Sequence, residues 1–224
     1  MEVFQKLLLW IDPVKRAGPE AMAVDEWLLE TAISPVLRIY RWDGDWASVG
    51  YFGKIEDARA AISDVRWVRR WTGGGAVDHR ADWTYTLAIP HFEKLATARG
   101  AESYRRIHAA LAEALTAEGI AVRMSAGEDE TGAALCFENP VSHDLVGEAG
   151  MKLAGAGQRR TRQGLLHQGS ASLQCDEPTS TKRAERLAGI LATAWKMTDL
   201  QPDSAILAEK SAARYSQEKW TEKR

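Results

Sequence analysis

The segment from Arg69 to His79 combines two arginines, three consecutive glycines and a histidine, in the order Arg69-Arg70-Trp71-Thr72-Gly73-Gly74-Gly75-Ala76-Val77-Asp78-His79. Glycine lets backbone N–H groups approach a ligand closely, and arginine donates charge-assisted hydrogen bonds to a carboxylate, a phosphate or a developing oxyanion. The spacing differs from the G-x-G-x-x-G of a dinucleotide site and from the Gly-Lys-Ser/Thr end of a P-loop. The segment therefore predicts one wall of an acyl or acyl-adenylate pocket. The alternative is a glycine-rich hairpin with solvated arginines.

A second informative segment covers residues 151–173. Residues 151–160 are typical of a strand of small side chains, residues 161–164 of a turn, and residues 165–173 of the returning strand of a hairpin. The small residues at positions 154–157 leave room above a sheet for a long apolar ligand, which is one reason why glycine occurs inside strands. Close packing against a helix is the alternative explanation of the same residues.

The remaining pattern alternates helices and strands without an internal repeat. Strands at residues 64–68 and 83–89 flank the glycine segment and place it between two strands. A helix is expected from Gly18 to about Thr31, and strands at 36–41 and 47–51 are expected to pair across the Asp43-Gly44 turn. Further expected elements are a helix at 101–118 ended by Gly119, a strand at 120–124, and two C-terminal helices at 181–197 and 206–220.

Composition limits the classes of function. The 224 residues are 45% hydrophobic and 27% charged, which is ordinary for one large globular domain with a substantial core. A net charge of −2 gives no overall attraction to nucleic acid or to an anionic membrane. Residues 1–10 fit neither a signal peptide nor a membrane span, so we expect a cytoplasmic protein with no membrane partner. We expect a monomer, because no segment offers a long apolar face without a core to fill. Cys136 and Cys175 make neither a disulfide framework nor a zinc pattern, and no metal site is expected.

Three stretches, in this order along the chain, resemble the signature of one family. Residues 22–29 are similar to its opening helix, and residues 69–79 to its glycine loop. Residues 152–160, Lys152-Leu153-Ala154-Gly155-Ala156-Gly157-Gln158-Arg159-Arg160, followed by Leu166-His167-Gln168-Gly169-Ser170, are similar to its third motif. Together they resemble lipoate-protein ligases and octanoyltransferases over roughly residues 18–197. The resemblance implies an α+β fold of the biotin/lipoate protein ligase catalytic-domain type: a single domain of residues 1–224 with a mixed β-sheet flanked by helices, and C-terminal helices at about 181–220 appended.

The resemblance assigns roles to residues of these motifs. Lys152 is expected at the acyl carbonyl, where its ammonium group stabilises the oxyanion that develops during acyl transfer. Arg70 and the backbone of Gly73–Gly75 form a wall of the pocket, and His79 lies at its rim near the incoming lysine of the carrier. The other residues expected at the substrate site are Thr72, Gly155, Ala156, His167 and Gly169. Both histidines are also typical of structural hydrogen-bonding residues, and His167 would then hold the hairpin.

Cys136 separates two chemistries within this family. In Leu135-Cys136-Phe137-Glu138-Asn139-Pro140 its placement is similar to that of the nucleophile in one octanoyltransferase branch. A thiolate is the reactive form, and a nearby lysine or arginine lowers the pKa of a thiol. This favours a transferase without cofactor that accepts an octanoyl group from acyl carrier protein as a Cys136 thioester. The acceptor is a lysine of a lipoyl carrier domain, such as the glycine cleavage H protein or a 2-oxoacid dehydrogenase E2 domain.

Other readings of the same family stay open. One alternative is a ligase that uses ATP and Mg²⁺ and acts through lipoyl-adenylate, with Cys136 only packing the pocket floor. Gly73–Gly75 matches the ligase form of the loop, whereas the short expected C-terminal part, in place of an accessory domain, favours a transferase. A third hypothesis is a non-catalytic scaffold that binds lipoyl domains, against which the retained Lys152 argues. Arg159, Arg160 and Arg162 are expected either to contact an acidic carrier protein or to form a solvated hairpin tip.

Overall fold

The computed structural model describes residues 3–127, 131 and 138–223, so Cys136 lies outside the described residues. The strands are β1 (Phe4–Ile11), β2 (Val36–Tyr40), β3 (Trp46–Val49), β4 (Arg66–Arg69), β5 (Val77–Asp78), β6 (Trp83–Pro90), β7 (Arg123–Met124), β8 (Leu145–Val146), β9 (Lys152–Arg160), β10 (Gly164–Ala171) and β11 (Ala192–Met197). The helices are α1 (Gly18–Thr31), α2 (Ile55–Ala61), α3 (Lys94–Thr97), α4 (Gly100–Thr116), α5 (Glu177–Leu191), α6 (Ser204–Lys210) and α7 (Glu218–Thr221), with a 3-10 turn η2 (Glu148–Gly150) and a π-helical turn η3 (Ser211–Tyr215).

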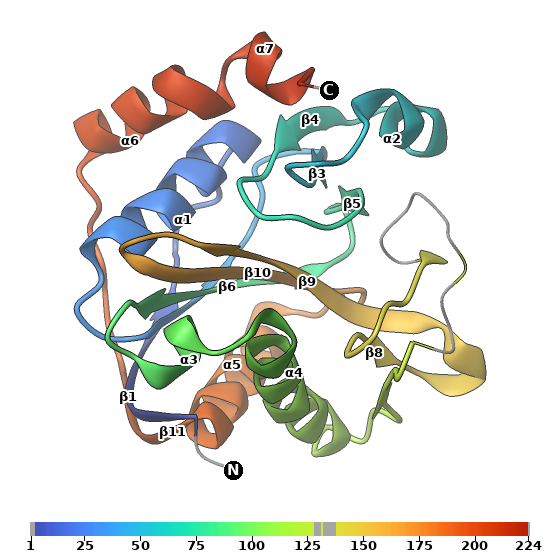
Figure 1. The fold of residues 1–224 in the computed structure, drawn as a ribbon, viewed down its shortest axis with the longest axis vertical. Helices are drawn as coiled ribbons and strands as arrows, with labels where there is room; N and C mark the ends of the chain where they lie inside the picture. Colours follow the sequence, from blue (N-terminus) through green and yellow to red (C-terminus); the bar gives the residue numbers. More distant parts are fainter. Residues whose placement is uncertain (1–2, 128–130, 132–137, 224) are drawn as a thin grey trace.

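Within the part of the chain that the structure describes, the strands form two sheets (Figure 1). The large sheet has the order β11-β1-β2-β6-β10-β9-β8-β7, and the small sheet has the order β4-β3-β5. β1 runs parallel to both of its neighbours, whereas β6 and β10 run antiparallel to theirs. The expected α+β fold with a mixed sheet flanked by helices is therefore confirmed.

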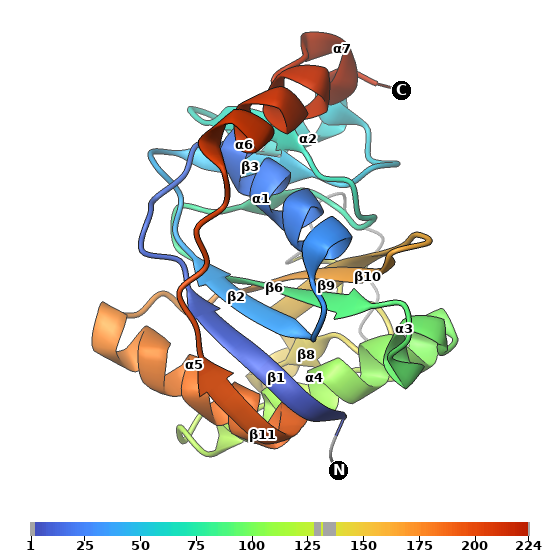
Figure 2. The same ribbon diagram turned by 90° about the vertical axis from the view of Figure 1, so that its left-hand side faces the viewer.

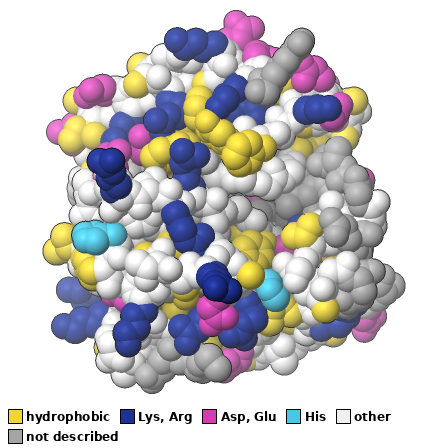
Figure 3. Space-filling view, viewed as in Figure 1, with side chains coloured by type: hydrophobic (Ala, Val, Ile, Leu, Met, Phe, Trp, Pro, Cys, Tyr) yellow, Lys and Arg dark blue, Asp and Glu magenta, His cyan; other side chains and the backbone are white. Residues whose placement is uncertain are grey.

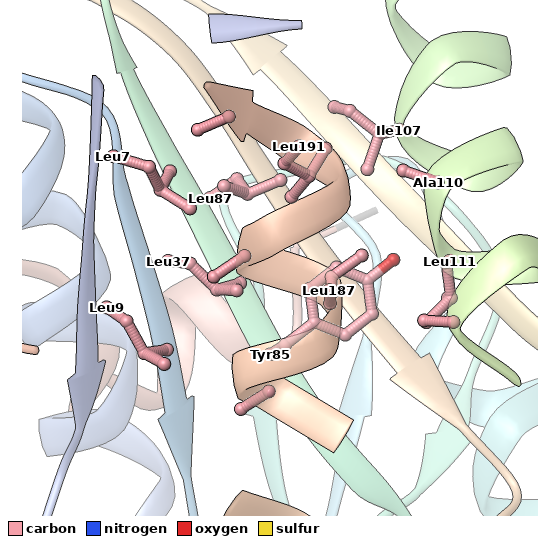
Figure 4. Close-up of a cluster of buried hydrophobic side chains, with 14 of the residues drawn as sticks. Leu7, Leu9, Leu37, Tyr85, Leu87, Ile107, Ala110, Leu111, Leu187 and Leu191 are labelled. Carbon is pink, nitrogen blue, oxygen red and sulfur yellow. The ribbon is translucent and has the colours of Figure 1, made fainter. Parts of the chain in front are cut away.

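Helices α4 and α5 cover one face of the large sheet (Figure 2). Leu7, Leu37 and Leu87 from three neighbouring strands meet Leu111 of α4 and Leu187 of α5 in this layer (Figure 4), and each is at most 1% exposed. Burial of one such side chain contributes about 1.5–3 kcal/mol. Because both faces of the sheet are covered, β6 is buried at every position, including the polar Thr84 and Thr86.

Helix α1 covers the opposite face of the sheet, and α6 and η3 pack against the outer side of α1 (Figure 2). It begins at Gly18 with Pro19 in its first turn, where the missing N–H of proline leaves no helical hydrogen bond unmade. Glu26 of α1 accepts hydrogen bonds from Arg214 and from the Tyr215 hydroxyl, both at 2.6 Å, which fastens η3 to α1. Among the described residues, every helix falls short of the length and hydropathy that crossing a bilayer requires.

A fully buried arginine connects α1 to the sheet. Arg38 of β2 is 0% exposed, and its guanidinium group lies 2.8 Å from Asp12 and 2.7 Å from Asp25 of α1. Burial raises the pKa of Asp25 despite the nearby charge of Arg38. Burial also acts on Asp12, but the charges and hydrogen bonds of Arg38 and Arg16 outweigh it and lower the pKa of that carboxyl. The junction of helix and sheet thus depends on buried charges that stay paired.

The prediction of one helix over residues 181–197 is wrong for residues 192–197. α5 ends at Leu191, and residues 192–197 form β11, which pairs in parallel with β1. The helical spacing of this segment is a local property, whereas its pairing with a strand at the other end of the chain supplies hydrogen-bond partners that no local pattern shows. The helix expected at 206–220 is divided into α6, η3 and α7.

The expected pairing between strands 36–41 and 47–51 is also wrong. β2 lies between β1 and β6 in the large sheet, whereas β3 lies between β4 and β5 in the small one. Directly after β2, the chain pairs with the backbone of Arg16. The N–H of Arg16 donates to the Arg41 carbonyl at 3.1 Å, and its carbonyl accepts from the Asp43 N–H at 2.9 Å. The Asp43-Gly44 turn therefore carries the chain into the second sheet instead of closing a hairpin.

We expect Arg38→Met to lower the free energy of unfolding by about 3–5 kcal/mol, because the buried charge of Asp25 loses its cation. Urea denaturation measures this loss. Arg41→Ala is the control: Arg41 pairs with Glu177 while both side chains are largely exposed, at 48% and 65%. Exposed pairs of this kind contribute about 1 kcal/mol or less. Equal losses in the two variants would contradict a special role for the buried pair.

Candidate functional site

The glycine segment is a loop between β4 and β5 whose two arginines are buried. Arg69 is 0% exposed and Arg70 is 6% exposed, so the alternative of a hairpin with solvated arginines is wrong. Arg69 donates to the carbonyls of Gly50 and of Thr221 in α7, both at 2.8 Å. Arg70 donates to the carbonyls of Gly73 at 3.1 Å and of Gly75 at 3.0 Å. Both arginines therefore hold backbone carbonyl groups in place, and the glycine loop bends around the guanidinium group of Arg70.

The loop is seated between two further glycines. A Cβ atom at Gly50 would lie 1.9 Å from the carbonyl oxygen of Gly74, and a Cβ atom at Gly157 of β9 would lie 2.3 Å from that of Gly73. Gly74 itself has φ of +96°, a conformation that favours glycine. The small residues of β9 therefore leave room for the backbone of the glycine loop. This backbone lies closer to β9 than the apolar ligand or the packed helix that the sequence suggested.

A small, partly open pocket lies between the loop and the large sheet. The loop contributes Arg70, Val77 and His79, and β9 contributes Gly155, Ala156 and Gly157. The lining is completed by Tyr40, Trp42, Thr84, Gln168, Gly169 and Ser170.

Polar side chains around this pocket bond to one another and not toward its interior. Thr84 and Ser170 donate to the carboxylate of Asp82 at 2.9 and 2.5 Å. The side-chain amide of Gln168 donates to Asp25 at 2.7 Å. Because these groups are already paired, the pocket presents mainly carbon surface, which suits a hydrocarbon chain.

Lys152 lies at the start of β9, beside the pocket. Its ammonium group is 2.5 Å from Asp144 and 3.4 Å from the carbonyl oxygen of Asn139, and the charged side chains of the pair are 3% and 0% exposed. A Cβ atom at Gly155 would lie 2.8 Å from the Lys152 Nζ atom, so the ammonium group reaches this place because residue 155 is glycine. The Tyr104 hydroxyl donates to Asp144 at 2.6 Å and fixes the carboxylate that orients the lysine.

An open groove of about 880 Å³, solvent at its mouth included, adjoins the pocket. Ala156 and Gly157 line both spaces, so the two meet at β9. Gly73 and Gly74 form one side of the groove, and Tyr104 of α4 lies in its lining. A second molecule can therefore approach the pocket along the side of the glycine loop.

His167 lies against α4 and apart from the pocket lining. Its ring is 0% exposed and lies 5.6 Å from the ring of His108, between centroids. Its Nδ1 is 2.9 Å from the amide nitrogen of Gln158, so it binds across the β9–β10 hairpin. Burial lowers the pKa of His167 well below its usual range and lowers that of His108 to about 4. Both imidazoles are neutral near pH 7 and act as structural partners, as the hairpin-holding interpretation of His167 expects.

The structure brings together most of the residues that the sequence motifs indicated. Arg70, His79, Gly155, Ala156 and Gly169 line the pocket, Gly73 and Gly74 line the groove, and Thr72 and Gly75 hold the loop. His79 lies in the lining of the pocket, and its expected place at the rim near the carrier lysine stays a prediction. It is 8% exposed in the wall of the pocket, and its ring stacks on Trp42 with centroids 4.1 Å apart.

Several lining residues were not assigned to the site from the sequence. Gln168 and Ser170 belong to the third motif and alternate along β10, so the two-residue period of a strand would have placed them on one face. Tyr40, Trp42 and Thr84 come from other parts of the chain, and no local pattern connects them to the loop.

The arginines of the hairpin are placed in three different ways. Arg159 lies over the ring of Trp71 at 4.5 Å, Arg160 donates to Ser103 at 2.6 Å, and Arg162 is exposed at the turn. Figure 3 shows basic side chains spread over the face that carries this hairpin, with hydrophobic ones between them.

The fold, the seated glycine loop and the buried lysine define a lipoyl protein ligase A/B catalytic domain, whose family model matches residues 18–207. The chain belongs to this family. It is 35% identical to Octanoyltransferase LipM of Carboxydothermus hydrogenoformans and 31% identical to that of Symbiobacterium thermophilum, each over 75% of this chain. The matched regions are 65% and 66% of those relatives, slightly less than two thirds of their length.

Solved structures share the fold over nearly the whole chain. Protein Ta0514 of T. acidophilum with bound lipoic acid has a TM-score of 0.75 at 18% identity and covers 99% of this chain and 100% of its own. Lipoate-protein ligase A bound with ATP has a TM-score of 0.66 at 18% identity, with 99% of each chain covered. At these identities the likeness establishes the fold alone.

We expect Gly157→Ala to weaken the binding of octanoic acid about tenfold, because the new methyl group displaces the Gly73 carbonyl and with it the pocket wall. Isothermal titration calorimetry measures the affinity. Gly189→Ala adds the same atom where its nearest neighbour, the Trp195 indole nitrogen, is 3.5 Å away, and serves as the control. Unchanged affinity in Gly157→Ala would contradict the seated-loop geometry.

The buried His108 predicts a loss of stability in acid. Its folded pKa of about 4 lies below the ordinary value of 6.5, so the unfolded chain binds the proton first and stability falls as pH decreases through this range. The contribution is on the order of 2 kcal/mol between pH 6.5 and pH 5. Urea unfolding as a function of pH should show a flatter decline for His108→Gln than for the unmodified protein. Parallel curves would exclude this histidine as the cause.

Proposed function

We propose that this chain is an acyltransferase that attaches an octanoyl or lipoyl group to one lysine of a lipoyl carrier domain. The observation that carries the proposal is the juxtaposition of a pocket of carbon surface with the buried Lys152–Asp144 pair, which meet at Gly155. Octanoyltransferase relatives that are 31% and 35% identical support this choice within the family. The acyl chain fills the pocket, and its carbonyl group lies at the lysine.

Lys152 suits the stabilisation of an oxyanion. Its ammonium group is held by Asp144 in a site with 3% exposure, where a fixed positive charge acts more strongly than in water. The tetrahedral intermediate of acyl transfer carries a negative oxygen, so the lysine lowers the barrier when that charge develops. Asp144 orients the lysine and takes no part in bond changes.

The thioester route assigns the nucleophile to Cys136. Its thiolate attacks the carbonyl carbon of octanoyl-acyl carrier protein, a new C–S bond forms, and the carrier leaves as its thiol after protonation. The acceptor lysine amine then attacks the Cys136 thioester, loses a proton and forms the amide, and the cysteine thiol is regenerated. Asn139, three residues after Cys136 in the sequence, has its carbonyl 3.4 Å from Lys152.

Both partners act through the groove that adjoins the pocket. Its open side gives a carrier protein access to the point where pocket and groove meet, at Ala156 and Gly157. The acyl carrier protein delivers the octanoyl group first, and the lipoyl carrier domain presents its lysine afterwards. This route needs no cofactor.

An ATP-dependent ligase is the second candidate, because a solved structure with the same fold is lipoate-protein ligase A bound with ATP. In that reaction ATP and Mg²⁺ supply the activation of a free acid as its adenylate. The two routes differ in whether the protein itself carries the acyl group, which makes the covalent intermediate the discriminating observation.

We expect the intact protein to gain one octanoyl group on incubation with octanoyl-acyl carrier protein without ATP, as measured by mass spectrometry. Hydroxylamine should remove the adduct, and Cys136→Ala should not form it, since a thioester needs the thiol. Cys175→Ala is the matched control and should still form it. Lys152→Ala should form the adduct about 100-fold more slowly, because one oxyanion contact is lost.

The opposite result is equally specific. If no adduct forms, and Cys136→Ala still modifies a lipoyl domain when octanoic acid, ATP and Mg²⁺ are supplied, the thioester route is excluded and the ligase stands. Binding of a lipoyl domain without modification under either condition would instead identify a scaffold.

A further inference from the structure

Ser48 and Asp82, which no sequence motif indicated, complete a chain of hydrogen bonds behind the pocket. The Asp82 carboxylate is 2.7 Å from Nδ1 of His79, and Nε2 of His79 is 2.6 Å from the Ser48 hydroxyl. The Ser48 hydroxyl is in turn 2.6 Å from Nη1 of Arg70. We name these four residues, Asp82, His79, Ser48 and Arg70, the buried chain. It ends at the arginine that curls the glycine loop.

The donors are fixed at the two ends of the buried chain. A guanidinium group only donates, so the Ser48 hydroxyl accepts from Arg70, and a carboxylate only accepts, so Asp82 accepts from Nδ1 of His79. A buried carboxylate and a buried guanidinium group are thereby connected through His79 and Ser48, with every bond at 2.7 Å or less.

Both ends of the buried chain are anchored in the fold. Asp82 also accepts from Ser170 of β10 at 2.5 Å and from Thr84 of β6 at 2.9 Å, so its carboxylate belongs to the large sheet. Ser48 belongs to β3 of the small sheet, and its own carbonyl accepts from Arg70 at 3.1 Å. The buried chain thus ties the large sheet, the small sheet and the glycine loop together at one point.

Ser48, His79 and Asp82 have the relative arrangement of a nucleophilic triad, yet Ser48 does not occupy the position of a nucleophile. It is 0% exposed, and it is not among the described residues that line the pocket. Its hydroxyl oxygen faces the Arg70 guanidinium group. A nucleophile must reach its substrate, so the geometry points to a role in holding Arg70.

We propose that Ser48 and Asp82 are positioning residues for acyl binding, which through His79 and Arg70 keep the glycine loop closed on β9. The identity of the ligand rests on the proposed function, whereas the closure of the loop does not. Arg70 holds the carbonyls of Gly73 and Gly75, and the Gly73 carbonyl leaves no room for a side chain at Gly157. Release of Arg70 therefore moves the wall of the pocket directly.

The first test measures the loop without reference to any activity. Hydrogen exchange of the amides at residues 70–79 is followed by mass spectrometry in Ser48→Ala, Asp82→Asn and the unmodified protein. We expect exchange about tenfold faster in both variants, since each loses a hydrogen bond to a charged group. Thermal unfolding checks that both variants remain folded. Asp82→Asn keeps the shape of the side chain and supports the conclusion if Ser48→Ala is poorly folded.

Ser103→Ala is the matched control, because Ser103 is also 0% exposed and also accepts from an arginine, Arg160, at 2.6 Å. Its exchange at residues 70–79 should equal that of the unmodified protein. Equal exchange in Ser48→Ala and Ser103→Ala would overturn the proposal.

The second test separates positioning from catalysis. Ser48→Ala and Asp82→Asn should each raise the KM for the acyl donor about tenfold and leave kcat within about threefold of its original value. The KM of the double variant should be little higher than that of either single variant, because both residues act through the same buried chain. A loss confined to kcat, or additive effects on KM, would overturn the proposal. If the unmodified protein transfers no acyl group, the proposed function fails, and the hydrogen-exchange comparison still decides whether Ser48 and Asp82 hold the loop.

Discussion

The ion pair between Arg38 and Asp25 is the interaction on which most of this structure depends. Both side chains are completely buried, and Asp25 also accepts a hydrogen bond from Gln168 at 2.7 Å. Gln168 accepts in turn from Thr72, at the start of the glycine loop, at 2.7 Å. The charge pair that joins α1 to the sheet therefore reaches the wall of the pocket through a single amide group. Stability and ligand binding consequently share the same residues.

The glycine loop is held by two buried carboxylates from different parts of the fold. Asp25 acts on Thr72 through Gln168, and Asp82 acts on Arg70 through His79 and Ser48. Between these anchors the loop packs backbone against backbone on Gly50 and Gly157. This construction pairs the guanidinium group of Arg70 in the pocket wall with carbonyl groups of the loop, which suits the binding of an apolar chain.

The two motifs were visible in the sequence, because turns, glycine-rich loops and alternating strands leave local patterns, and the fold class followed from the resemblance of these motifs to one family. The hairpin of β9 and β10 and the helix α1 lie where those patterns indicated. The segment 192–197 shows the limit: its spacing is helical, but the exposed edge of β1 makes it a strand. The two edges of β2 are likewise occupied by β1 and β6, strands from distant parts of the sequence, so β3 pairs in the second sheet.

By itself, the sequence determined the glycine loop, the lysine at the start of β9 and the family to which both belong, since each is expressed within a few consecutive residues. Only the tertiary structure decided that Trp42 stacks on His79, that Ser48 and Asp82 complete the buried chain, and that Thr72 bonds to Gln168. Ser48 and His79 are 31 positions apart, and Thr72 and Gln168 are 96 apart. Contacts at such separations depend on how whole elements pack, because the backbone must first be folded before these side chains can meet.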